Sequence, residues 1–126
     1  MSRFRSALAH YSALFDALEN SIPADHSDRH ILDQEIFGRE ILNIVACEGL
    51  ERVERAEPYR QWQSRTLRAG FQQVPISAEF QDIVRKLMTE FHPKYGIGED
   101  GNWFLIGWKE RITHAITAWE PASVGP

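Results

Sequence analysis

Three glycines near the carboxyl end have the spacing of a dinucleotide-binding loop. Gly96, Gly98 and Gly101 spell G-x-G-x-x-G, in which backbone N–H groups at a helix start bind a pyrophosphate. That motif follows a strand and opens a helix, whereas here it precedes an apolar run typical of a strand. Glu99 and Asp100 would also repel a phosphate. We interpret the segment as a glycine-rich turn before a hairpin and expect no cofactor.

Other residues capable of chemistry lack partners at a useful spacing. His26 and His30 could share a metal ion on one helix face, but a helix that begins at Ser27 leaves His26 outside it. Cys47 lies in an apolar run and is expected to be an inert buried thiol. His114 is expected to be a hydrogen-bonded or partly exposed strand residue rather than a catalytic one. The sequence contains no nucleophile elbow, P-loop or zinc-protease motif. We therefore predict no catalytic residue, no metal site and no enzyme activity.

The charge of the 126-residue chain is uneven. The net charge of -4 argues against a wholly basic nucleic-acid-binding module. Residues 51–70 nevertheless contain five arginines and three glutamates. This stretch is typical of a solvated helix face, and the alternative is a docking surface for an acidic partner or a nucleic-acid backbone. The candidate partner-binding residues are Arg39, Glu40, Arg52, Arg55 and Arg65.

The cysteine content and the apolar runs argue against a disulfide-bonded, a membrane-spanning or a secreted protein. The single cysteine excludes an intrachain disulfide and agrees with a reducing compartment. The longest apolar run is far shorter than a bilayer span, and no apolar segment of a secretory signal follows the first ten residues. We expect no membrane partner.

Apolar periodicity predicts helices in the first half of the chain. Apolar residues three and four apart predict an amphipathic helix over about residues 2–20. A second helix is predicted from Ser27, as N-cap, to Gly49, although residues 41–47 could instead be a buried strand. Pro58 suits the first turn of a third helix, and Gly70 is predicted to be its C-cap.

The second half adds strands. Residues 71–76 predict a short strand, and Pro75 within it indicates an edge position or a bulge. Ser77 is a predicted N-cap for a fourth helix. Residues 103–108 and 112–119 predict an antiparallel hairpin, and its first strand is apolar on both faces and should be covered on both. This order of elements predicts a mixed α/β fold.

Large aromatic residues are numerous for a chain of this length, with four Trp, seven Phe and three Tyr. We interpret Trp62, Trp108 and Trp119 as core anchors that join the third helix to the terminal hairpin.

Several segments and spaced tryptophan pairs follow one another along the chain. The segments are His10–Asp16, Gly38–Glu40, Asn43–Gly49 and Glu51–Arg55 with Glu57, and the spaced pairs are Trp62 with Gly70 and Trp108 with Trp119. In the same order, they resemble the motifs of the GRAS domain of plant regulatory proteins, and the pattern is similar to that of the scarecrow-like branch. Thr117 and Ala118 before the last tryptophan match a closing Ser-Ala-Trp motif of that domain with the hydroxyl kept.

The resemblance implies a fold and a domain organisation. It covers the chain from Arg3 to about Pro121 and concerns the carboxyl-terminal part of the domain only. We expect residues 1–121 to form a partial GRAS domain and residues 122–126 a tail. The implied fold is the carboxyl-terminal portion of a Rossmann-like, methyltransferase-type sheet with flanking helices and an antiparallel terminal hairpin. The strands that build a nucleotide site belong to the part that is not matched, so no cofactor is expected.

The resemblance also implies a function. We expect a nuclear transcription regulator that acts through protein–protein interaction with other GRAS or zinc-finger proteins. DNA contact is an open alternative for the full domain but is not expected for this segment alone, and no small-molecule substrate is expected. A second hypothesis is a truncated, non-regulating fragment that pairs with such partners, and a third is a methyltransferase-like enzyme. Open apolar stripes predict self-association or a molten state in isolation.

Overall fold

The computed structural model describes residues 2–53 and 55–123. Glu54 of one matching segment and residues 124–126 of the predicted tail lie outside the described residues. Residue contacts divide the chain into an amino-terminal unit, Met1–Ala56, and a carboxyl-terminal unit, Glu57–Pro126. Each unit has its own secondary structure and its own buried side chains.

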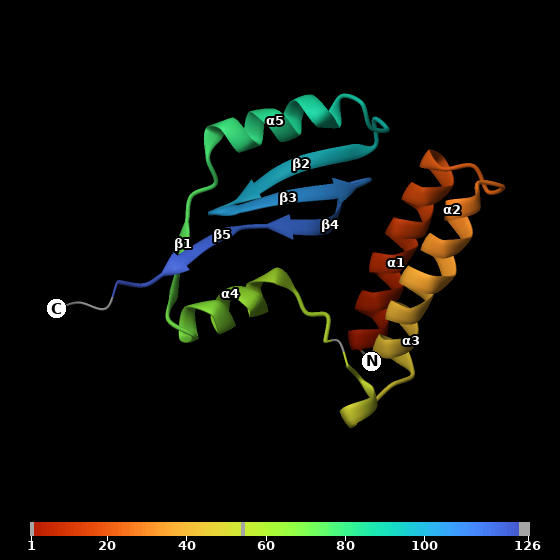
Figure 1. The fold of residues 1–126 in the computed structure, drawn as a ribbon, viewed down its shortest axis with the longest axis horizontal. Helices are drawn as coiled ribbons and strands as arrows, with labels where there is room; N and C mark the ends of the chain where they lie inside the picture. Colours follow the sequence, from red (N-terminus) through yellow and green to blue (C-terminus); the bar gives the residue numbers. More distant parts are fainter. Residues whose placement is uncertain (1, 54, 124–126) are drawn as a thin grey trace. The chain divides into compact units, whose positions relative to one another are not determined.

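Two antiparallel helical segments make up most of the amino-terminal unit (Figure 1). The first predicted helix is confirmed as α1. The second is confirmed as a continuous helical run in which a π-helical segment, η1, separates α2 from α3, and a 3-10 helix, η2, follows. The bounds are α1 Ser2–Ser21, α2 Ser27–His30, η1 Ile31–Gly38, α3 Arg39–Val45 and η2 Gly49–Glu51.

The ends of the second helical run differ from the prediction. The N-cap is His26, whose Nδ1 accepts a hydrogen bond from the backbone N–H two residues later at 3.2 Å, so Ser27 is already helical. The run ends at Val45, and Gly49, with a φ of 57°, begins the separate helix η2. Since most of residues 41–47 continue the helical run, the alternative of a buried strand is wrong.

The core of the amino-terminal unit lies between α1 and the second helical run. Its buried members are Ala7, Tyr11 and Ile44. The ring of Phe37 lies 6.3 Å from that of Tyr11 and 5.7 Å from that of Phe15, measured between centroids. Because these aromatic contacts join η1 to α1, the apolar stripe predicted for α1 packs on the second helical run.

Arg29 is buried and holds the end of α1 against the start of the second helical run. Its guanidinium donates to the backbone oxygens of Leu18 at 3.4 Å and Ile22 at 2.9 Å. It also donates to the carboxylates of Glu19 at 2.8 Å and Asp33 at 3.0 Å. The hydrogen bond to Glu19 is the main cause of the raised pKa of Arg29, which burial opposes. Arg29 thus supplies donors to carbonyl groups at the end of α1, where Leu18 also accepts from the N–H of Ile22 at 2.9 Å.

The carboxyl-terminal unit is α/β with antiparallel sheets. A 3-stranded sheet has the order β2-β3-β4, and a 2-stranded sheet pairs β1 with β5. The predicted third and fourth helices are confirmed as α4 and α5, and Ser77 caps α5 by accepting from the N–H of Phe80. The bounds are α4 Tyr59–Arg68, β1 Phe71–Val74, α5 Ala78–Met88, β2 Tyr95–Asp100, β3 Trp103–Trp108, β4 Arg111–Ile116 and β5 Ala118–Pro121.

The segment with the G-x-G-x-x-G spacing is a strand, not the predicted turn. It forms most of β2, in which Gly96 lies opposite Gly107 and Gly98 opposite Leu105 of β3. Only Gly101, with a φ of 59°, lies in the turn that joins the two strands. The interpretation as a turn fails because pairing with β3, rather than a local apolar pattern, makes this segment a strand.

The predicted terminal hairpin is confirmed as β3 and β4, but its second strand is shorter than expected. It stops at Ile116, and β5 begins after Thr117. The Thr117 hydroxyl accepts a hydrogen bond from Gln73 at 2.6 Å and donates one to the backbone oxygen of Asn102 at 3.2 Å. These bonds mark the point where the chain leaves one sheet and joins the other.

Strand β3 is covered on both faces, as predicted. The ring of Trp103 lies 5.0 Å from that of Tyr59 on α4, and the ring of Phe104 lies 6.0 Å from that of Phe80 on α5. Consecutive strand residues point to opposite faces. The two helices therefore cover opposite faces of β3, as Figure 1 shows.

The three tryptophans interpreted as core anchors differ in burial. Trp108 is 1% exposed on β3, and Trp119 is half-buried on β5. Trp62 is 49% exposed, so its expected burial is wrong for this structure. The reason is that α4 turns Tyr59 and Gln63 towards β3 and leaves Trp62 on a neighbouring face. The predicted helix-ending glycine, Gly70, follows α4 with a φ of 88°.

Candidate interaction surface around Glu48

Three arginines act on one carboxylate in the amino-terminal unit. Arg3, in the first turn of α1, donates a hydrogen bond to Glu48 and forms an ion pair with it. Arg52 and Arg55 also act on this carboxylate through their charges. The Arg3 hydrogen bond, followed by these charges, holds the pKa of Glu48 below its ordinary value. We call Arg3, Arg52 and Arg55 the arginine cluster.

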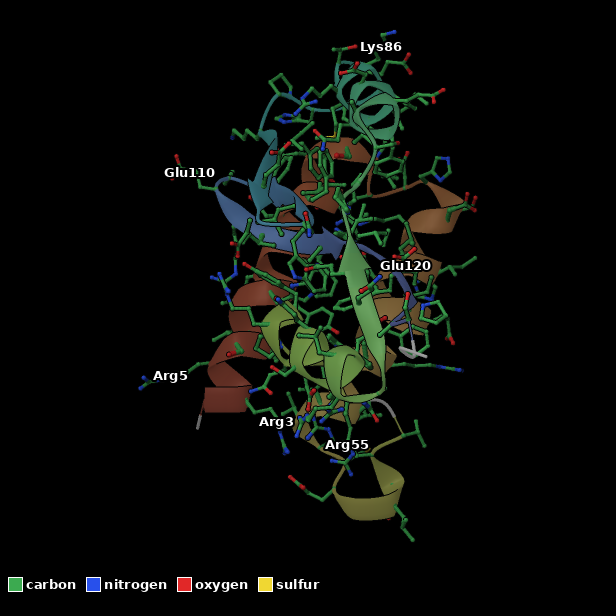
Figure 2. The ribbon with its side chains drawn as sticks, turned by 90° about the vertical axis from the view of Figure 1, so that its left-hand side faces the viewer. Arg3, Arg5, Arg55, Lys86, Glu110 and Glu120 are labelled. Carbon is green, nitrogen blue, oxygen red and sulfur yellow. The ribbon has the colours of Figure 1, made fainter. Side chains whose placement is uncertain are left out.

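The segment after α3 positions two members of the arginine cluster. The guanidinium of Arg55 donates to the backbone oxygen of Gly49 at 3.1 Å, which fixes it beside η2. The Nε of Arg52 is buried and has no hydrogen-bond partner among the described residues. Figure 2 shows Arg3 and Arg55 at the same end of the unit, whereas Arg5 points away. A buried N–H without an acceptor is costly, so this Nε lowers the stability of the segment that carries it.

The other predicted partner-binding residues lie elsewhere. Arg39 is exposed and forms an ion pair with Glu35 at 2.9 Å. Glu40 accepts a 2.9 Å hydrogen bond from the hydroxyl of Tyr11 and so ties α3 to α1. The structure therefore brings Arg52 and Arg55 together and gives Glu40 a structural contact.

Arg65 belongs to the carboxyl-terminal unit. It forms an ion pair with Glu57 at 2.7 Å, and its guanidinium carbon lies 5.8 Å from the centroid of the Trp62 ring. These contacts give Arg65 partners within its own unit.

The sequence did not identify Arg3 and Glu48 as members of one site. They lie 45 residues apart, and only the packing of α1 beside α3 brings them together. Glu48 does fall inside the matching segment Asn43–Gly49, which is the one signal that could have drawn attention to it.

A second polar cluster, in the carboxyl-terminal unit, joins α4 to the β2–β3 turn. Asp100 accepts hydrogen bonds from Tyr59 at 2.6 Å and from Arg60 at 2.5 Å. The Nε1 of Trp103 donates to Gln63 at 3.1 Å. The hydrogen bond to Asp100, followed by burial, raises the pKa of Tyr59. These contacts fix the ends of α4 and β2, so Asp100 serves the fold.

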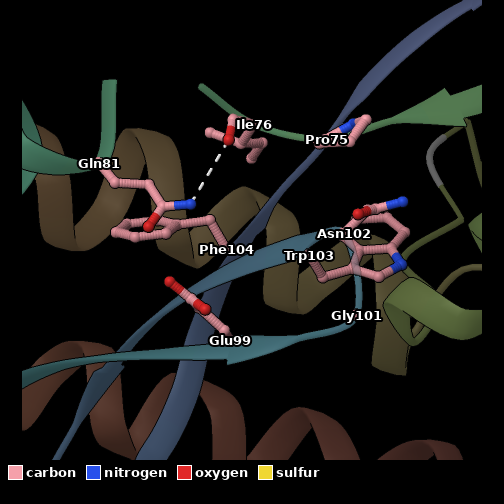
Figure 3. A pocket seen from close by; sticks show the side chains of 8 residues that line it. All are labelled: Pro75, Ile76, Gln81, Glu99, Gly101, Asn102, Trp103 and Phe104. Carbon is pink, nitrogen blue, oxygen red and sulfur yellow. Dashed lines mark hydrogen bonds between the residues drawn. The ribbon is translucent and has the colours of Figure 1, made fainter. Parts of the chain in front are cut away.

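A small pocket lies beside the β2–β3 turn (Figure 3). Its volume of about 70 Å³ is far below that of sites that hold drug-sized ligands. The amide of Gln81 donates to the backbone oxygen of Ile76 at 3.4 Å across one wall. The residues that line it are Pro75, Ile76, Gln81, Glu99, Gly101, Asn102, Trp103 and Phe104.

The residues examined for metal chemistry have other surroundings. Among the described residues, no three His, Cys, Asp or Glu side chains are grouped so that they could hold a metal ion. Cys47 is half-buried rather than buried, and Nδ1 of the exposed His114 lies 3.0 Å from the Thr113 hydroxyl. Within the part of the chain that the structure describes, no helix is both long and apolar enough to span a bilayer.

Comparison with known proteins identifies the class to which this α/β chain and its motifs belong. The model of the GRAS domain family matches residues 1–120, and the chain belongs to this family. The chain is 45% identical over 124 residues to Scarecrow-like protein 14 of Arabidopsis thaliana, which covers 98% of this chain and 16% of that protein. It is 35% identical over 119 residues to chitin-inducible gibberellin-responsive protein 1 of Oryza sativa subsp. japonica, covering 94% and 21% respectively.

A solved structure shares the fold. The crystal structure of SCL7 in Oryza sativa superposes with a TM-score of 0.87 at 28% identity, over 94% of this chain and 34% of that chain. The chain thus spans about a fifth of the curated relatives it matches and about a third of the solved chain.

Proposed function

We propose that this chain is part of a nuclear transcription regulator of the GRAS family and that it acts through protein–protein contacts rather than catalysis. The observation that carries the proposal is the identity of 45% to Scarecrow-like protein 14 over 98% of this chain. Motifs in the same order as in the family, from His10 to Trp119, support it. The partners that this family resemblance implies are other GRAS or zinc-finger regulators, with DNA contact reserved for the full domain.

An exposed apolar stripe on α5 supports a role in protein contact. Ile83 is 57% exposed, and Leu87 and Phe91 are each 48% exposed. These residues are spaced by four, two on α5 and Phe91 just after its end at Met88, and define what we call the α5 stripe. The stripe borders the buried side of α5, where the ring of Phe80 packs against that of Phe104 at 6.0 Å. Phe91 contacts the ring of Tyr95 at 6.0 Å, and all three stripe residues still keep about half of their surface exposed. Contiguous exposed apolar side chains mark interaction sites.

The resemblance to SCL7 also supports a proposal about the complete fold. We place β2, β3 and β4 in the carboxyl-terminal portion of a Rossmann-like, methyltransferase-type sheet, with residues 1–121 as a partial GRAS domain. The TM-score of 0.87 over 34% of the SCL7 chain supports the part of this proposal that makes the chain one portion of a larger fold.

Co-precipitation with a GRAS-domain protein tests the proposed contact. The tagged chain should retain the co-expressed partner, and the double variant Ile83→Ser with Leu87→Ser should lose it. Lys86→Ser is the matched control, because Lys86 is an exposed polar residue of the same helix (Figure 2). Failure of the unmodified chain to retain the partner, or full retention by the double variant, would contradict the proposal.

Nuclear location is tested separately. The chain fused to a fluorescent protein too large for passive passage through nuclear pores should accumulate in plant nuclei. An even distribution between nucleus and cytoplasm would contradict the nuclear assignment.

A second candidate function is a non-regulating fragment that pairs with GRAS or zinc-finger partners. Partner binding without any effect on transcription would support this candidate over the first.

A further inference from the structure

The pocket beside the β2–β3 turn, which we call the turn pocket, has the dimensions of a single side chain. Its volume is about 70 Å³. A cavity holds one water molecule once it offers about 10 to 15 Å³. The turn pocket therefore has room for a few water molecules or for the end of one long side chain, and not for a whole small-molecule ligand.

Aromatic and aliphatic side chains form much of the wall of the turn pocket (Figure 3). Pro75 and Ile76 come from the connection between β1 and α5, and Trp103 and Phe104 come from β3. Trp103 is 6% and Phe104 is 1% exposed, so the packing of the sheet holds both rings in place. Such walls suit the apolar stem of a long side chain, and aromatic rings also attract a cation.

Of the described residues that line the turn pocket, only Glu99 is charged. It lies opposite Phe104 in the register of β2 and β3, so both side chains leave the same face of the sheet. In Figure 3 the Glu99 carboxylate points towards the Phe104 ring. The side chain of Glu99 is 52% exposed, so a group from solvent can reach it.

The Glu99 carboxylate keeps acceptor capacity although it pairs with Arg85. The guanidinium of Arg85 lies 3.2 Å from Oε1 of Glu99. It also lies 3.6 Å from the Asp82 carboxylate and 3.3 Å from the side-chain oxygen of Gln81, so three groups share it. Oε2 of Glu99 and the side-chain amide of Asn102 have no hydrogen-bond partner among the described residues. An ionised carboxylate offers about four acceptor sites, so a second cation can bind beside Arg85.

We propose that the turn pocket binds one lysine side chain of a partner protein. The stem of the lysine would lie against Ile76 and Phe104, and its ammonium would donate to Oε2 of Glu99 and to the side-chain oxygen of Asn102. A lysine suits the narrow pocket because its cation is compact and its stem is flexible and apolar. The inference rests on the proposed protein-contact function and names an anchor outside the α5 stripe.

A small probe tests the pocket directly. N-acetyl-lysine methylamide is titrated into the isotope-labelled full chain and followed by NMR, with N-acetyl-norleucine methylamide as the probe that lacks the ammonium. The lysine probe should shift the amide signals of Gly101 and Asn102 and the indole signal of Trp103 in a saturable way, and the norleucine probe should not. Equal shifts with both probes, or no shift with the lysine probe, would overturn the proposal.

Removal of the Glu99 charge tests the role of the carboxylate. Glu99→Gln should weaken binding of the lysine probe by about fivefold, because the ammonium loses its charged acceptor. Glu79→Gln is the matched control, since it makes the same change in charge at an exposed residue of α5 that does not line the pocket, and should leave the affinity unchanged. Circular dichroism would show that both variants keep their secondary structure. Equal effects of the two substitutions would refute the assigned role of Glu99.

The co-precipitation assay tests the origin of the lysine. Glu99→Gln should reduce retention of the GRAS-domain partner, and Glu79→Gln should not. Full retention by Glu99→Gln would contradict binding of a partner lysine in the turn pocket. Failure of the unmodified chain to retain any partner would instead contradict the proposed function, whereas the probe titration reports on the pocket alone.

Discussion

The hydroxyl of Tyr59 donates a 2.6 Å hydrogen bond to Oδ2 of Asp100 and so joins the first residue of α4 to the last residue of β2. The ring of Tyr59 also packs against that of Trp103, the first residue of β3. One side chain therefore fixes a helix to both strands of the β2–β3 hairpin.

Tyr59→Phe should lower the free energy of unfolding by about 1 kcal/mol, because the pair is only partly shielded from solvent. The pKa of Tyr59 is raised above its ordinary 10.0, so the folded state holds the hydroxyl proton more tightly. The stabilisation is present below pH 10.0 and is lost as the pH rises through the folded pKa. Urea denaturation at neutral and alkaline pH should show that the difference in free energy of unfolding between the unmodified chain and Tyr59→Phe shrinks as the pH rises through the folded pKa of Tyr59. A difference that grows with pH would contradict the assignment.

Arg29→Lys should lower the melting temperature, because a lysine ammonium cannot reproduce the contacts of Arg29 with two carboxylates and two helix-end carbonyls. Arg39→Lys, on the same helical run, changes an exposed residue with an ion pair to Glu35 and should leave the melting temperature nearly unchanged. Thermal melts followed by circular dichroism make the comparison. Equal effects of the two substitutions would refute the capping role of Arg29.

Trp108→Ala should lower the free energy of unfolding by about 3 to 5 kcal/mol, because this side chain is 1% exposed and contacts the rings of Tyr95 and His92. Trp62→Ala should cost less than about 1 kcal/mol, since Trp62 is 49% exposed. Urea denaturation of the two variants measures both values. Similar losses for the two tryptophans would show that their burial differs from that described.

Gly107→Ala should destabilise the hairpin by about 1 to 3 kcal/mol. An added Cβ would lie 2.8 Å from the backbone oxygen of Arg111, at the bulge where the register of β3 and β4 shifts. Gly98→Ala is the control, because a Cβ at Gly98 meets no atom within 4 Å in the described structure. Chemical denaturation should separate the two variants, and a neutral Gly107→Ala would contradict the close approach.

The elements that the sequence predicted well are those with a strong local signal. The cap of α5 at Ser77 is encoded within a few residues, and so is the apolar run of β3. Strand β2 was missed because its glycines show no apolar alternation, and only pairing with β3 makes it a strand.

The candidate site was predictable only in part. Arg52 and Arg55 stood out as part of a basic stretch. The ion pair between Arg3 and Glu48 depends on the packing of two helices, and no local spacing encodes a contact across 45 residues. The exposure of Trp62 likewise depends on which side of α4 meets β3, which composition does not reveal.

The proposed regulation of transcription through protein contacts can be measured with a reporter assay in plant protoplasts. The chain is tethered to a heterologous DNA-binding domain upstream of the reporter gene. The tethered chain should change reporter expression, Ile83→Ser with Leu87→Ser should remove the change, and Lys86→Ser should keep it. Reporter expression that is the same with and without the tethered chain would contradict the claim.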